Sequence, residues 1–102
     1  MKFMVLAVVP IEKLGEAAAA HDKVWAAEPP ERRPKSAYVL MCVPFEVPPH
    51  SMVTTYIIEA DTMEAVAARV YPIMLAGASV NVIPLMEFTP GGAAKAQERF
   101  KG

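Results

Sequence analysis

The sequence contains a single cysteine, Cys42, among its 102 residues. One cysteine cannot form a disulfide within the chain, and it rules out any metal site built from several thiolates. Cys42 lies in an apolar, strand-like run, where a free cysteine usually packs as a small hydrophobic residue. We therefore expect a structural role for this side chain.

An excess of charge of one sign is also missing. The ten Lys and Arg residues and eleven Asp and Glu residues give a net charge of −1. Nucleic-acid binding needs a dense basic face, whereas the only basic pair here is Arg32-Arg33. We therefore expect no nucleic-acid partner.

Long hydrophobic stretches are absent as well. No run reaches the roughly 18–20 apolar residues that span a bilayer. The first apolar run, Lys2–Val9, lacks the basic leader and small-residue cleavage site of a signal peptide. We expect a cytoplasmic protein without a membrane partner.

Hydrophobic residues nevertheless make up 54% of the chain. They gather in four strand-like runs, Lys2–Val9, Ala37–Val43, Met52–Ile58 and Ser79–Met86, in which Lys2 is the only charge. Side chains alternate between the two faces of a strand, so a sheet with one solvated face alternates apolar and polar residues. These runs do not alternate, which predicts a sheet that is apolar on both faces.

A first helix is predicted over Ile11–Ala27, before the helix-terminating Glu28-Pro29-Pro30. Residues that recur at spacings of three and four share one helix face. In this segment they are Ile11, Leu14, Ala18, His21 and Trp25. We expect this face to lie against the sheet.

A second helix is predicted after Asp61–Glu64, which has the form of a capping box. Its expected inner face consists of Met63, Val66, Ala67, Val70 and Met74. Gly77 is the expected C-cap, and Pro84 indicates an edge strand or a bulge in the last strand.

The resulting order, β-α-β-β-α-β, predicts an α+β ferredoxin-like fold with a four-stranded antiparallel sheet and both helices on one face. The uncovered face would measure roughly 500 Å², near the upper limit for apolar patches on monomers. A symmetric pairing of two copies would cover it. We predict one domain over residues 1–89, a hinge with a short helix or tail over residues 90–102, and a homodimer or larger homo-oligomer.

The start of the chain, MKFMV, the order of elements and the last strand, ending VIPLMEF, resemble small families of the dimeric α+β barrel superfamily. The resemblance covers residues 1–89 and implies subunits that pair sheet to sheet around ligand cavities. The superfamily includes monooxygenases, isomerases and cyclases, so it implies no single reaction. Haem-degrading members use an Asn, Trp and His set that Trp25 and Asn81 do not match in position, and no catalytic residue carries over.

His21 is the strongest candidate for a catalytic residue. It shares the inner helix face with Trp25, which would form part of a cavity wall. Imidazole gains and loses a proton near neutral pH, so it can act as a base or a ligand. The alternative is a His21 side chain at the border of the core, bonded to a backbone carbonyl or to water.

Four further residues are candidates for substrate binding: Tyr38, Tyr56, Tyr71 and Asn81. A tyrosine suits an apolar cavity with few polar groups, because its buried hydroxyl needs a partner. Asn is uncommon in strands, so Asn81 could orient a substrate oxygen. The alternative is that Tyr71 packs at a helix end and Tyr38 lies at the rim of the fold.

Neither a metal nor a cofactor is expected. The seven methionines are spread along the chain, as expected for core filler and not for a copper site. Only His21, Asp22 and Glu28 lie close enough in sequence to suggest a metal, and no cofactor motif is present.

Three kinds of function remain open at this stage. The first is a cofactor-independent enzyme of isomerase, cyclase or monooxygenase type, acting on a small apolar or aromatic molecule in a cavity between sheet and helices. The second is a non-catalytic module that binds a small apolar ligand, and the third is an oligomeric assembly module. A group that could move a proton, His21, favours the first, and the scarcity of ionisable interior residues favours the second.

Overall fold

The computed structural model of the chain describes residues 1–100. Its main elements are, in order, β1 (Lys2–Pro10), α1 (Leu14–Ala27), β2 (Ala37–Val39), β3 (Ser51–Glu59), α2 (Met63–Leu75) and β4 (Ser79–Leu85). The predicted α+β class and β-α-β-β-α-β order are therefore confirmed. Short 3-10 turns lie at Ile11–Lys13 and Pro30–Arg32, and the described chain ends in α3 (Ala93–Ala96) and a 3-10 turn, Gln97–Phe100.

The four strands form one antiparallel sheet in the order β2-β3-β1-β4. β4 lies at an edge, as Pro84 indicates. The other edge strand, β2, is shorter than predicted, because pairing continues only to the hydrogen bond from Leu40 N to Val53 O, at 2.8 Å. The loop that follows contains three prolines, which lack the N–H that a ladder needs. Cys42 consequently lies exposed in this loop and not in a packed strand.

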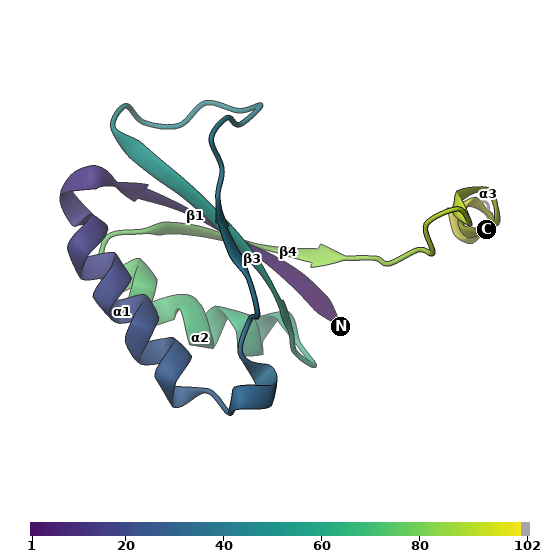
Figure 1. Cartoon of the computed structure of the whole chain (residues 1–102), viewed down its shortest axis with the longest axis horizontal. Coiled ribbons are helices and arrows are strands. Elements are labelled where there is room, and N and C mark those ends of the chain that lie inside the picture. The colour runs from purple at the N-terminus through teal and green to yellow at the C-terminus, as the bar shows by residue number, and fades with distance from the viewer. Residues whose placement is uncertain (101–102) are drawn as a thin grey trace.

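Both helices cover the same face of the sheet (Figure 1). The side chains of β1 that point to this face are Phe3, Val5, Ala7 and Val9, each at most 7% exposed. From α2, Val66 and Val70 pack onto Phe3 and Val5, while Ile73 joins Ala7 and Val9. The hydrophobic core therefore lies between the centre of the sheet and α2.

The inner faces of both helices differ from the sequence prediction. In α1 the buried residue is Ala17, whereas Ile11 and Trp25 are exposed. Ile11 belongs to a 3-10 turn, which has three residues per turn and shifts the phase of the helix that follows. In α2 the buried residues include Ile73, and the predicted Met74 is exposed.

The N-terminus of α2 begins one residue later than the predicted capping box. Thr62 is the N-cap, and its hydroxyl accepts a hydrogen bond from Ala65 N at 3.1 Å. Because Ala65 occupies the third helical position, Glu64 cannot complete a capping box there.

The predicted glycine cap at the end of α2 is confirmed. Gly77 has φ +113° and donates to Met74 O at 3.0 Å, while Ala78 N donates to Ile73 O at 3.3 Å. This bond pattern is a Schellman motif. A Cβ at Gly77 would lie 2.9 Å from Cγ of Lys13, so both the backbone angle and the close approach favour glycine.

The opposite face of the sheet, here called the open face, is also apolar. Register places Met4, Leu6 and Val8 of β1 on it, with Ile57 of β3 and Ile83 of β4 beside Met4. Ile57 is half exposed, and the helices lie on the other side. Apolar side chains thus lie on both faces of the sheet, as expected, although Thr55 and Asn81 share the open face with them.

The segment after β4 leads away from the domain and ends in α3 (Figure 1). Arg99 Nη1 donates to Glu87 O at 3.0 Å, which folds the end of this segment back onto its own start. The radius of gyration is 15.4 Å, larger than the roughly 13 Å of a compact chain of this length. The last two residues of the predicted tail, 101–102, lie outside the described part.

We predict that Thr62→Ala lowers the free energy of unfolding by about 1 kcal/mol, because it removes the oxygen that satisfies Ala65 N. Urea denaturation measures the change. Asp61→Ala is the control, since a cap at Asp61 would make its effect the larger of the two.

Candidate ligand-binding site

An apolar cavity of about 220 Å³ lies between α1 and the helix-covered face of the sheet. Its floor includes Val5, Ala7 and Val80, and its roof includes Leu14 and Ala17 of α1. The first half of α1 is rich in small residues, Gly15 and Ala17–Ala20, and only Ala17 in this helix is buried. Short side chains cannot fill the space between helix and sheet, and the cavity is the result.

Four polar residues line this cavity: His21, Asp22, Thr54 and Tyr56. The rings of His21 and Tyr56 meet edge to face, with centroids 5.5 Å apart and an interplanar angle of 68°. His21 comes from α1 and Tyr56 from the middle of β3, so the two main layers of the fold each supply one ring. His21 Nδ1 lies 3.6 Å from Asp22 Oδ1, beyond hydrogen-bond distance.

Tyr56 is the most deeply buried polar group of the cavity, with 9% of its surface exposed. Burial raises the pKa of its phenol, because the charged phenolate is poorly solvated there. The hydroxyl therefore stays protonated at neutral pH and can donate a hydrogen bond. Within residues 1–100 no hydrogen bond from this hydroxyl to the protein is formed, so it is available to a ligand.

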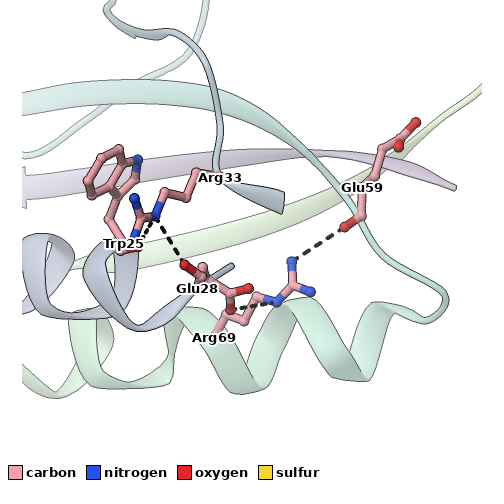
Figure 2. Close-up of polar contacts among 5 residues, drawn as sticks. All are labelled: Trp25, Glu28, Arg33, Glu59 and Arg69. Atoms are coloured by element: carbon pink, nitrogen blue, oxygen red, sulfur yellow. Dashed lines mark hydrogen bonds and ion pairs between the residues drawn. The ribbon is translucent and has the colours of Figure 1, made fainter. Parts of the chain in front are cut away.

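A second, smaller hollow of about 30 Å³ adjoins the cavity, and His21 and Tyr56 line both. Its charged residues are Glu28, Arg32 and Arg69. Arg69 Nε lies 3.0 Å from Glu28 Oε1, and both side chains are less than one-fifth exposed (Figure 2). Arg69 Nη1 also donates to Glu59 O at 3.4 Å, so this side chain connects α2 to β3 and to the end of α1.

Arg33 fixes the chain where α1 ends. Its Nε donates to Trp25 O at 2.9 Å and to Glu28 O at 3.1 Å, and its Nη2 donates to Ala26 O at 3.1 Å. Carbonyls at a helix C-terminus have no partner within the helix, and of these three Trp25 O also accepts from Glu28 N at 3.3 Å. The guanidinium also lies 4.2 Å from the centroid of the Trp25 ring. Figure 2 shows the two side chains next to each other. Trp25 thus borders the small hollow and holds Arg33, and it does not line the apolar cavity.

The structure brings only some of the predicted site residues together. His21 and Tyr56 meet in the cavity, as expected of residues from the inner helix face and the sheet. Tyr38 and Asn81 lie on the open face, because register aligns them with Thr55 and Leu6. Tyr71 is exposed on α2. These three residues are therefore not part of this cavity, and binding roles for them stay predictions.

The sequence prediction missed Arg69, Arg32 and Thr54 as residues of this region. Arg69 follows Val66 by three positions and precedes Val70 by one, so it borders the buried face of α2. The only sequence feature that could have indicated Arg69 is its position as a single arginine beside the apolar face of this helix. Thr54 lies two residues before Tyr56 on β3, and strand alternation therefore places both side chains on the same face of the sheet.

No protein-family model matches this chain, and no curated protein shows significant similarity to it. Within residues 1–100, no helix is long and apolar enough to cross a membrane. In the same part of the chain, no three His, Cys, Asp or Glu side chains gather as a metal site would need. The case for function therefore depends on the geometry of the cavity.

We predict that the free energy of unfolding falls as the pH rises above about 10, in part because of Tyr56. The pKa of this phenol is raised only in the folded state, so the unfolded chain loses the phenol proton at a lower pH. Ionisation then favours the unfolded state, and the free energy of unfolding falls. Tyr56→Phe has no such proton and should lose less stability between about pH 9 and 11. Urea denaturation at both pH values checks this, and equal losses in the two proteins would contradict burial of the phenol.

Proposed function

We propose that the apolar cavity binds a small apolar or aromatic molecule, and that His21 and Tyr56 catalyse a proton transfer on it without a cofactor. The observation that carries the proposal is their edge-to-face pairing, at 5.5 Å, within an otherwise apolar cavity. A few polar groups converging in an apolar cavity are the usual mark of a ligand site.

The size of the cavity limits the ligand. At about 220 Å³ it is smaller than the 300–1,000 Å³ typical of sites for drug-sized molecules. A ring the size of an aromatic side chain buries roughly 150–250 Å², which corresponds to about 4–6 kcal/mol of hydrophobic free energy. Association entropy opposes this gain, so a bare ring should bind in the millimolar range.

The two rings suit complementary roles in such a reaction. His21 would remove a proton from a carbon next to a carbonyl group, and Tyr56 would donate a hydrogen bond to the carbonyl oxygen as its negative charge grows. Return of the proton to the same or a neighbouring atom would complete an exchange or an isomerisation. The raised pKa of Tyr56 supports this division, because the phenol remains a donor.

We predict that the protein accelerates exchange of the methyl protons of acetophenone with D2O, followed by NMR. His21→Ala should lower the rate by about 10²–10⁴-fold, because general-base catalysis contributes about that much. Tyr56→Phe should reduce it less, and His50→Ala, at an exposed loop histidine, should leave it unchanged. Binding of acetophenone without enhanced exchange would contradict catalysis and favour the non-catalytic ligand-binding module.

The open face supports a second proposal, that the chain functions as a homodimer, or a larger homo-oligomer, with open faces packed together as in a dimeric α+β barrel. Apolar side chains from β1, β3 and β4 lie on this face. Four strands present roughly 500 Å² of sheet, while a standard interface covers about 800 Å² per partner. Residues outside the strands, such as the exposed Phe45 of the loop after β2, would have to supply the remainder.

We predict that sedimentation at about 10 μM finds a dimer, and that Ile57→Lys shifts it toward single subunits. A lysine there would place an unpaired charge in the apolar interface. Leu75→Lys is the matched control, because Leu75 is exposed on the helical side. A wild-type protein that sediments as one subunit would contradict the proposal.

A further inference from the structure

Three spaces follow one another from the interior of the domain to its surface. The apolar cavity and the small hollow share His21 and Tyr56. The small hollow and a wide outer groove of about 810 Å³ share Arg32, Arg69 and Ile58. The two rings of the proposed site therefore lie where an apolar space meets a charged one.

Positive charge is concentrated along this route. The outer groove is lined by five cationic side chains and three anionic ones, although the chain as a whole has a net charge of −1. In the small hollow, Arg32 and Arg69 face a single carboxylate, that of Glu28. The hollow therefore has one positive charge in excess, which favours a monoanion.

The two arginines have hydrogen-bond donors to spare. Arg69 uses Nε for Glu28 and Nη1 for Glu59 O, which leaves three of its five N–H groups. Arg32 forms no ion pair within residues 1–100. Its backbone N–H donates to Pro29 O at 2.9 Å, in a 3-10 turn bounded by prolines. This turn holds the Arg32 backbone beside the hollow.

We propose that the ligand of this site is an apolar or aromatic carboxylate, with its apolar body in the cavity and its carboxylate held by Arg32 and Arg69 in the small hollow. The inference depends on the proposed ligand-binding function of the cavity. A volume of about 30 Å³ matches a planar carboxylate better than a bulkier phosphate. A guanidinium group presents paired N–H donors that fit a carboxylate.

This arrangement would also orient the ligand for reaction. A carboxylate in the small hollow and a ring in the cavity place the atoms between them at the shared boundary, beside His21 and Tyr56. A carbonyl group and its neighbouring carbon, if they lie between the ring and the carboxylate, would therefore be next to the proposed base and donor. Binding energy from the charged end would position the reacting carbon.

The test compares phenylacetate with its neutral isostere phenylacetamide, by NMR titration at low salt. Wild-type protein should bind phenylacetate at least about tenfold more tightly, because two guanidinium groups face the carboxylate. Arg32→Gln and Arg69→Gln should each reduce this preference severalfold. Arg99→Gln, in the segment after β4, is the matched control and should retain it.

The outcomes separate this inference from the proposed function. Equal binding of the two probes to wild type would overturn carboxylate recognition and leave ligand binding intact. Absence of binding by both probes would overturn both. A preference that survives Arg32→Gln and Arg69→Gln would overturn the assignment to this hollow. Arg69→Gln could disrupt folding through loss of its pair with Glu28. In that case the preference of Arg32→Gln for phenylacetate is the deciding measurement, and circular dichroism checks that this variant is folded.

Discussion

Strand β1 pairs with β3 on one side and β4 on the other, so its side chains contribute to both layers of the molecule. Phe3 and Val5 form the core with α2, while Met4 and Leu6 point to the open face. A shift of one residue in register would exchange these two sets. The position of the cavity on one face and of the proposed dimer contact on the other both depend on this alternation.

The two helices use the inner face of the sheet differently. α2 packs Val66 and Val70 directly onto the strands and closes that half of the core. α1 presents mainly alanine, which leaves space above Tyr56 that larger residues would have filled. The proposed binding space thus lies under α1 and the closely packed core under α2, so a ligand of the proposed kind would occupy one half of the core and leave the other half closed.

The sequence predicted the fold well because its signals are local. Apolar runs located the strands, and Gly77 marked the end of α2. The limits of β2 and the phase of α1 depended on the Pro-rich loop and on a 3-10 turn, which periodicity does not reveal. For the site, His21 and Tyr56 were predicted, but Arg69 was not, because its pairing with Glu28 joins residues 41 positions apart in the sequence. The strand register, which the sequence does not reveal, places Tyr38 and Asn81 on the open face and not in the cavity.

The turn after α1 has a consequence for the energetics of recognition. Pro29, Pro30 and Pro34 surround Arg32, and Arg33 anchors the same segment to the last carbonyls of α1. Proline removes backbone freedom from the unbound chain, so little disorder remains to be lost when a ligand arrives. Rigidity of the segment from Pro29 to Pro34 would thereby increase affinity for the proposed ligand without adding a contact.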